Sequence, residues 1–368
     1  MFKKYILTAF ALLISTIVVA ETMWAIIPGR PVPGGTTRWA WLWAKHMNNN
    51  IHHGSQVTNI DFKYIIGNRG KKSLRKFHKT LQFDHTHMQV SHGGNATAPL
   101  LEDVGGYNFR EYTPIMIHPG NMLVPVNRNY NMDTDKQVSA LNNGGGSEPD
   151  HFGAALLVCP FTDNMDKFMA CFDKKVTIVR GMKSGRQQAL INGELSIGRE
   201  TWQHWSGNAV YQDNLDKVKL WFHHCQIDWA RDSRTPVWID DNNPQLKGMC
   251  FDDVFEAIHN RKPSGVVFDA YKLTVLFRDG IQKSLFINKN SPYIDDMVKI
   301  TKATWADPAF QAERLATLGD YDAYIGKDAE IVLKQVLGGI NREALEVAVR
   351  FVSEGLGYNA SVKEELLQ

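Results

Sequence analysis

The sequence predicts an α/β protein built as two lobes. Apolar segments that suit strands alternate with segments that suit helices, beginning with residues 23–27 and 37–47. This order is typical of sheets that are mostly parallel and flanked by helices. Two glycine-rich turns, at residues 33–37 and 144–147, each precede a helical segment. Without a removable N-terminal segment of twenty residues, 348 of the 368 residues remain, enough for two cores.

The first twenty residues have the pattern of a signal peptide. Lys3 and Lys4 form a basic start, and residues 5–19 are apolar but too short to span a bilayer comfortably. Small residues at positions 18–20 suit cleavage near Ala20. We therefore expect an exported protein, with an uncleaved anchor as the alternative. No cysteine stands directly after the apolar segment, which argues against a lipid anchor.

The charge balance argues against a nucleic-acid partner. The chain has 41 Lys and Arg residues against 39 Asp and Glu residues, whereas nucleic-acid binding needs a basic excess or a basic stripe. The local basic cluster at residues 71–76 fits a solvated helix face.

Four cysteines suit an oxidising compartment. Pairing of nearest neighbours, Cys159 with Cys171 and Cys225 with Cys250, is the simplest of three connectivities. Buried free thiols are the alternative. No two of these cysteines have the C-x-x-C spacing, so neither a zinc knuckle nor a redox motif is expected.

The glycine-rich turns are the candidate ligand-binding segments. Such a turn at a helix start leaves backbone N–H groups unpaired at the positive end of the helix, where an anion binds well. Two of them in one exported chain suggest two lobes that hold a carboxylate between them. Alternatively, Thr36 simply caps its helix. The turn residues predicted to bind the ligand are Gly34, Gly35, Thr36, Thr37, Gly145, Gly146 and Ser147.

Three charged residues complete the candidate site. The guanidinium of Arg38 would bind a carboxylate with two parallel hydrogen bonds if it points into the cleft, and it would be a surface cation if it points out. Arg199, just after a short strand, has the same two interpretations, and Glu200 follows it. The tryptophans near these segments, such as Trp39 and Trp205, either pack in the core or stack on a ring of the ligand.

Catalytic motifs are absent, so we expect neither an enzyme nor a cofactor or metal. The sequence contains no H-E-x-x-H, no G-x-S-x-G and no G-x-G-x-x-G. The alternative is a secreted hydrolase in the same cleft. It would use Ser147 with His151 four residues on, or a metal bound by histidines such as His85 and His87.

Several short segments follow one another in an order that is similar to a known family. They are Pro33-Gly34-Gly35, Asn68-Arg69-Gly70, Tyr112-Thr113-Pro114-Ile115, residues 122–127, Gly144-Gly145-Gly146-Ser147, residues 179–194 and residues 306–319. In this order they resemble the ligand loops, strand ends and penultimate helix pair of the Bug-type receptors. These are the periplasmic solute-binding proteins of tripartite tricarboxylate transporters. The resemblance covers most of the mature chain.

The resemblance implies a two-lobed periplasmic binding protein of type II-like architecture, with the ligand cleft between the lobes. Lobe 1 would comprise residues 21–121 plus 264–368, and lobe 2 residues 122–263. The implied ligand is a small organic anion, a di- or tricarboxylate or a related acid. The implied partners are the membrane permease subunits of a tripartite carrier, and we expect a monomer. A receptor-derived sensor is a further alternative.

The sequence also departs from the family pattern. Arg38 stands where the family often has Asp, and Asp150 stands where it has His, with His151 one residue later. Glu200 lies near a position where the family carries Asp. These departures predict a pocket whose chemistry differs from that of typical members.

Overall fold

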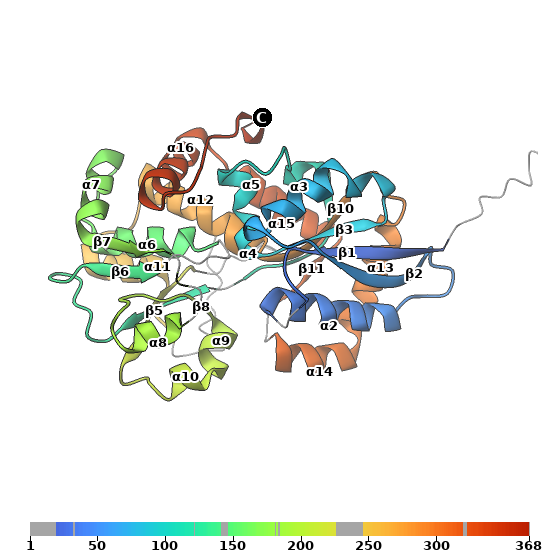
Figure 1. Ribbon diagram of the computed structural model, residues 1–368, viewed down its shortest axis with the longest axis horizontal. Helices are drawn as coiled ribbons and strands as arrows, with labels where there is room; N and C mark the ends of the chain where they lie inside the picture. Colours follow the sequence, from blue (N-terminus) through green and yellow to red (C-terminus); the bar gives the residue numbers. More distant parts are fainter. Residues whose placement is uncertain are drawn as a thin grey trace, which may run out of the picture.

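The computed structural model describes residues 20–31, 34–120, 122–140, 146–180, 182, 185–225, 246–318 and 322–367. These residues form two lobes (Figure 1). The predicted signal peptide lies outside the described residues, apart from Ala20. Within the described part, none of the helices combines the length and apolar character that a membrane crossing requires.

A six-stranded sheet forms the first lobe, in the order β11-β4-β10-β3-β1-β2. Its strands are β1 (Glu21–Ile27), β2 (Val57–Tyr64), β3 (His87–Ser91), β4 (Tyr112–His118), β10 (Lys283–Asn288) and β11 (Tyr324–Ile325). Strand β1 is parallel to β2 and β3, whereas β10 is antiparallel to β3 and β4, and β11 is antiparallel to β4.

The α/β class is confirmed, but the prediction of mostly parallel sheets is wrong, because this sheet is mixed. The chain leaves the sheet at His118, the last residue of β4, and re-enters at Lys283, the first residue of β10. These two residues pair with each other. Because the chain re-enters at the same end of the strands at which it left, β10 has to run antiparallel to β4. Sequence patterns do not record this return.

Helices cover both faces of the first sheet. In the view of Figure 1, α2 and α14 lie below the sheet and α3 lies above it. Trp39 and Trp43 of α2 are each 1% exposed, and the Trp43 ring lies 4.4 Å from that of Phe310 on α14, centroid to centroid. Core packing is therefore the main role of these rings. The helices are α2 (Gly35–Asn49), α3 (Lys71–Lys79), α4 (Gly93–Ala96), α5 (Ala98–Leu101), α13 (Ile294–Ala306), α14 (Pro308–Thr317) and α15 (Lys327–Gly338).

The second lobe contains two small sets of strands. Strand β5 (Met122–Asn127) lies between β8 (Glu200–Thr201) and β9 (Val218–His223), antiparallel to both, while β6 (Gln137–Ala140) pairs in parallel with β7 (Val176–Val179). Ile197 forms single bridges to Val126 of β5 and Ser139 of β6, and so links the two sets. The local pattern of residues 137–142 predicts a helix that closes into the glycine-rich turn. This prediction is wrong for 137–140, which form β6, while 141–142 lie outside the described residues.

Aromatic side chains fill the core of the second lobe, and helices from the end of the chain contribute to it. Helices α12 and α16 pack on each other, and α12 also packs on α6. Phe351, just after α16, stacks on Phe152 of α6 at a centroid distance of 4.2 Å. The helices concerned are α6 (Glu148–Val158), α7 (Met165–Lys175), α8 (Arg186–Ile191), α9 (Trp202–Gly207), α10 (Ala209–Gln212), α11 (Phe251–His259), α12 (Val266–Gly280) and α16 (Arg342–Arg350). The exact lobe bounds given above remain a prediction.

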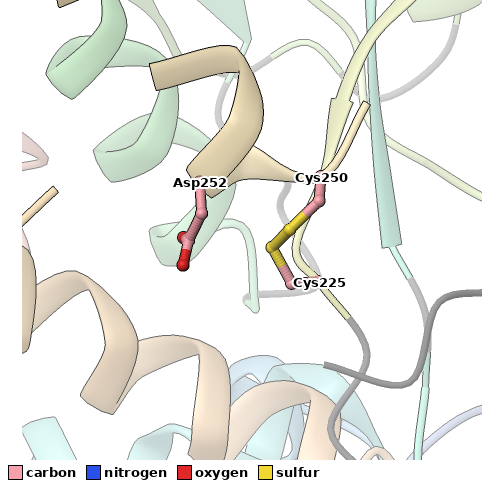
Figure 2. Close-up of side chains that lie close together, drawn as sticks. All are labelled: Cys225, Cys250 and Asp252. Atoms are coloured by element: carbon pink, nitrogen blue, oxygen red, sulfur yellow. A yellow bond between two sulfur atoms is a disulfide. The ribbon is translucent and has the colours of Figure 1, made fainter. Parts of the chain in front are cut away.

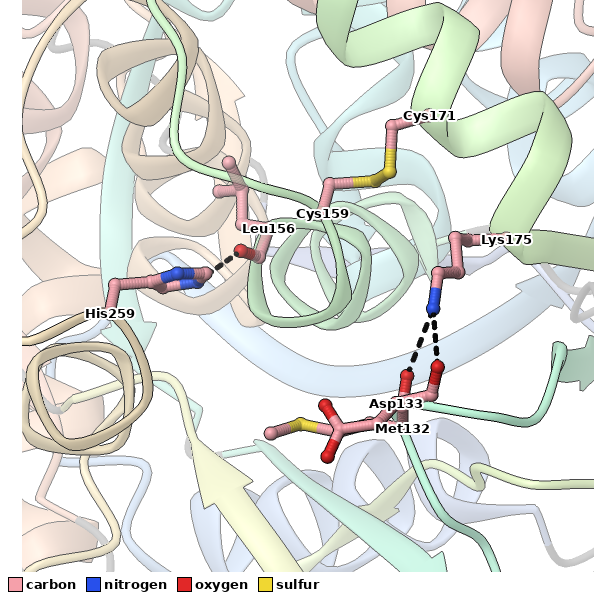
Figure 3. The surroundings of a disulfide bond; sticks show 7 residues. All are labelled: Met132, Asp133, Leu156, Cys159, Cys171, Lys175 and His259. Carbon is pink, nitrogen blue, oxygen red and sulfur yellow. Dashed lines mark hydrogen bonds between the residues drawn. A yellow bond between two sulfur atoms is a disulfide. The ribbon is translucent and has the colours of Figure 1, made fainter.

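Both predicted disulfides form. Cys159 and Cys171 join the end of α6 to α7, with their Cα atoms 5.8 Å apart, and Cys225 and Cys250 join the end of β9 to the start of α11. Figure 3 shows the surroundings of the first bond. There the Lys175 ammonium at the end of α7 donates to the carbonyl oxygen of Asp133, at 3.0 Å. The bond and this contact hold α7 on the second lobe.

Candidate ligand cleft

A cleft of about 540 Å³ lies between the lobes. The first lobe contributes the start of α2, and the second contributes the start of α6, the segment around β8 and the start of α8. The side chains and backbone that line it belong to Gly35, Arg38, Met122, Ala140, Ser147, Asp150, His151, Gly185, Arg186, Gln187, Leu195, Ile197, Gly198, Arg199, Glu200, Thr201, His204 and Tyr211. The starts of both predicted helices thus reach one cavity.

The first predicted turn ends in an uncapped helix start. Helix α2 begins at Gly35, and its N-cap residue, Gly34, offers no side chain to the N–H groups of the first turn. Thr37 is buried, and its hydroxyl donates to the carbonyl oxygen of Arg30 at 3.3 Å. Thr36 is half-buried. From this segment Gly35 and Arg38 line the cleft.

Arg38 is an exposed cation at the mouth of this cavity. No hydrogen bond or ion pair holds its guanidinium to any residue that the structure describes. Because it stands on the first turn of α2, its charge adds to the positive end of that helix instead of neutralising it. This corner of the cleft is therefore suited to an anion.

The second predicted turn is partly described: Gly144 and Gly145 lie outside the described residues. Gly146 is buried with a φ of +74°, and Ser147 is the N-cap of α6. A Cβ on Gly146 would lie 2.4 Å from the carbonyl oxygen of Gly93, so this turn packs backbone to backbone on the first lobe. Only glycine fits such a close approach.

His151, one turn into α6, is 3% exposed and lines the cleft. Neither of its ring nitrogens has a hydrogen-bond partner among the residues that the structure describes. Burial lowers its pKa to about 4, so at neutral pH it offers one donor and one acceptor without a charge. An unpaired buried imidazole is costly unless a ligand satisfies it.

Arg199 is positioned by a buried carboxylate. Its Nε lies 3.0 Å from Oδ2 of Asp150, while Nε2 of His224 lies 2.8 Å from Oδ1 and Nη2 of Arg278 lies 3.9 Å from Oδ2. Burial acts to raise the pKa of Asp150. The charges of Arg278 and Arg199 and the hydrogen bond with His224 outweigh it, and together they lower the pKa to about 2. Asp150 is therefore a fixed negative charge within the cleft wall.

A chain of hydrogen bonds supports Asp150 from behind. The other ring nitrogen of His224, Nδ1, lies 2.7 Å from the hydroxyl of Tyr271. This order of hydroxyl, imidazole and carboxylate is the one used in nucleophilic catalysis, but Tyr271 and His224 are 3% and 2% exposed. Burial also raises the pKa of Tyr271 well above its ordinary value, which keeps its hydroxyl protonated. The chain therefore positions Asp150.

Glu200 lines the cleft as a carboxylate whose oxygens are already occupied. Its Oε1 accepts from the hydroxyl of Tyr211 at 2.6 Å and from Nε2 of Gln187 at 3.1 Å, and its Oε2 contacts Nδ1 of His204. The hydrogen bond with Glu200 raises the pKa of His204. The negative charge on this wall is thus matched by a neighbouring imidazole.

The chemistry of the alternative enzymes is not assembled in the described part of the chain. Because both nitrogens of His151 lack partners, His151 does not act as a base on Ser147 in this conformation. His87 is engaged with Lys63 at 2.7 Å and with Asp84 at 2.6 Å.

Among the described residues, the one group of three ligand atoms near enough for a metal is Cys225, Cys250 and Asp252. Figure 2 shows both sulfurs joined in a disulfide, so neither is a thiolate ligand.

Sequence reasoning missed most of the buried charged network at this wall. Asp150 was noted only as a departure from the family pattern, His151 as such a departure and as the partner of Ser147 in the alternative hydrolase, and nothing local marks Arg278 or Tyr271. Their only sequence feature is that they are polar residues within apolar segments. That feature alone does not say which residues meet.

Comparisons with known proteins connect this geometry to a fold. No family model matches the chain, and no curated protein matches it in sequence. Among solved structures, the periplasmic binding protein BugD is similar at a TM-score of 0.51 and 17% identity, covering 91% of this chain and 97% of BugD. This chain has the periplasmic binding protein fold. The predicted two-lobed architecture and the resemblance to the Bug-type receptors are confirmed at the level of the fold.

Two further structures of this periplasmic binding protein fold contain ligands. MatC from Rhodopseudomonas palustris, with bound malate, has a TM-score of 0.50 and 17% identity, covering 89% of this chain and 98% of MatC. A second R. palustris protein, with adipate, has a TM-score of 0.50 and 13% identity, covering 89% of this chain and 97% of that protein.

Proposed function

We propose that this protein is a periplasmic solute receptor that binds a small organic carboxylate between its lobes and delivers it to the permease subunits of a tripartite carrier. The observation that carries the proposal is Arg38 at the uncapped start of α2, a guanidinium without an ion pair among the described residues, opposite the start of α6. The guanidinium and the positive end of α2 attract negative charge, and both lie in this cleft.

The remaining cleft residues suit recognition of an acid. Arg199 presents a guanidinium that Asp150 positions, and the imidazole of His151 offers an unused donor and acceptor. The carboxylates Asp150 and Glu200 are both matched by neighbouring cations or donors, so they do not cancel this attraction. The malate and adipate bound by the two R. palustris proteins are acids of this class.

Binding would favour closure of the lobes. An acid that contacts α2 from one lobe and α6 from the other binds best when the lobes are closed, so it shifts the population toward the closed form. Delivery to a permease needs no chemical change in the ligand.

Calorimetric titration with malate, adipate, succinate and citrate tests the proposal. We expect at least one of these acids to bind with a Kd at or below about 10 μM. Replacement of the cation in Arg38→Gln should weaken that binding about tenfold or more, because a charge-assisted hydrogen bond is lost.

Arg30→Gln is the matched control, because Arg30 is also exposed but does not line the cleft. We expect it to change the affinity less than about twofold. The absence of binding by all organic acids at millimolar concentration would rule out the proposed function.

A further inference from the structure

A second cavity, here called the side chamber, adjoins the main cleft. It has a volume of about 500 Å³ and shares Gly35, Arg38, Thr201 and His204 with the cleft. The start of α2 therefore lies at the junction of the two spaces. The remaining residues of the side chamber are Trp39, His118, Pro119, Gly207, Asn208, Ala209, Gln282, Lys283, Ala316, Thr317 and Leu318.

Two cations meet at this junction, and no carboxylate among the described residues forms an ion pair with either of them. Lys283 is half-buried at the start of β10, and its Nζ lies 3.6 Å from the point where a Cβ of Gly35 would be. Its ammonium therefore stands over the positive end of α2, beside the guanidinium of Arg38. Neither cation has a hydrogen bond or an ion pair with any residue the structure describes.

This placement of Lys283 costs free energy in the folded protein when no ligand is bound. Burial and the charge of Arg38 lower the pKa of Lys283 to about 8. His118, which pairs with Lys283 across the sheet, has its pKa lowered to about 3 by burial, Lys283 and Arg314. At neutral pH Lys283 is thus a poorly solvated cation next to a neutral imidazole. A bound anion would relieve this cost.

Trp39 supplies a second, independent indication of a ligand. It lines the side chamber and is 1% exposed, yet its indole N–H has no hydrogen-bond partner in the described part of the chain. Buried tryptophans usually find a partner for this donor. The same chamber has an apolar wall, formed by Pro119, Ala316 and Leu318, which suits a carbon chain.

We propose that the side chamber is a second anionic subsite, where Lys283 and Arg38 bind the distal acid group of an elongated organic dianion. The other carboxylate of that ligand binds in the main cleft, near Arg199 and His151. This inference rests on the proposed function. It narrows that function, because the second subsite would select dianions over monoanions of equal length.

The test compares acids that differ in one end group. Adipate and hexanoate have the same carbon chain, as do suberate and octanoate, but only the first of each pair carries a second carboxylate. We expect the protein to bind each dianion about tenfold to a hundredfold more tightly than its matched monoanion, as measured by calorimetry. In Lys283→Met this affinity ratio should fall by about tenfold, whereas Lys283→Arg should retain most of it.

Lys289→Met is the matched control, since Lys289 is exposed near the other end of the same strand and lines neither chamber. It should leave the ratio unchanged, and thermal unfolding of every variant confirms that it is folded.

Equal affinity for dianion and monoanion, or a ratio that is the same in Lys283→Met, would refute the subsite while leaving the receptor proposal intact. If no acid binds at all, the proposed function itself fails.

Discussion

Gly146 packs directly on Gly93, so that a Cβ on the first would lie 2.4 Å from the carbonyl oxygen of the second. Gly146 precedes α6 of the second lobe, and Gly93 begins α4 of the first. The contact brings the two lobes together beside the cleft. It explains why glycine is needed there. A side chain would clash with the backbone of Gly93, and the φ of +74° is unfavourable for residues other than glycine.

Gly146→Ala should destabilise the protein by more than its backbone conformation alone predicts. The positive φ costs about 1–2 kcal/mol for alanine, and the clash with Gly93 adds to that cost. Gly54→Ala is the control, because Gly54 has a φ of +84° but no atom within 4 Å of the added Cβ. Denaturant unfolding should rank Gly146→Ala as the less stable variant. Equal losses would show that the contact carries no strain.

Asp150→Asn should be strongly destabilising and should also weaken acid binding. The substitution leaves Arg199 and Arg278 without their shared carboxylate in a buried place, and we expect a loss of about 3–5 kcal/mol in the free energy of unfolding. Asp269→Asn is the comparison, because its ion pair with Lys272 is half exposed and should contribute less than about 1 kcal/mol. Similar losses in the two variants would argue against a buried network.

The pKa of Lys283 predicts that the difference in stability between Lys283→Met and the unaltered protein depends on pH. Its value of about 8 in the folded protein lies below the ordinary 10.5, so the folded state disfavours the charged form. This cost is fully present below pH 8 and disappears as the pH rises toward 10.5. Lys283→Met should therefore be more stable than the unaltered protein at pH 7, by about 1–3 °C in Tm, and the gain should shrink at pH 9.5.

Lys289→Met serves again as the control for this experiment. Its difference in Tm from the unaltered protein should be the same at pH 7 and at pH 9.5. A Lys283→Met variant that is less stable at pH 7 would contradict an unbalanced ammonium at the start of α2.

The disulfides predict the absence of free thiols. A thiol assay of the unfolded, unreduced mature protein should detect none, and reduction should release four per chain. Replacing each pair by serines should lower the free energy of unfolding by about 2–4 kcal/mol. The loss should be larger for Cys225 with Cys250, which are 25 residues apart against 12 for the other pair. The reverse order would show that the loop-entropy account fails here.

Local features of the fold were predictable from the sequence because neighbouring residues encode them. The start of α2 at Gly35 and of α6 after Ser147 follows from glycine-rich turns before apolar helical segments. The pairing of each cysteine with its nearest neighbour in sequence follows from the short separations. By contrast, residues 137–140 have no strong local preference, and their pairing with β7 makes them a strand.

The candidate site was predictable in part. Gly35, Arg38, Ser147, Arg199 and Glu200 all line the cleft as expected, although ligand contact remains a proposal. The hydroxyl of Thr37 is engaged by the carbonyl oxygen of Arg30, and Gly145 lies outside the described residues. Lys283 went unnoticed, because its significance depends on its distance from Gly35, which is remote in the sequence.

The sequence by itself indicated the α/β class, the two helix starts after glycine-rich turns and the simplest cysteine pairing, since each depends on residues that are near one another in the chain. Only the tertiary structure decided that Asp150 positions Arg199 and that Lys283 stands unbalanced over α2. It also decided that β10 runs against its neighbours. The physical reason is that charge interactions and strand pairing depend on distance in space. That distance is set only when the chain crosses to the second lobe and returns.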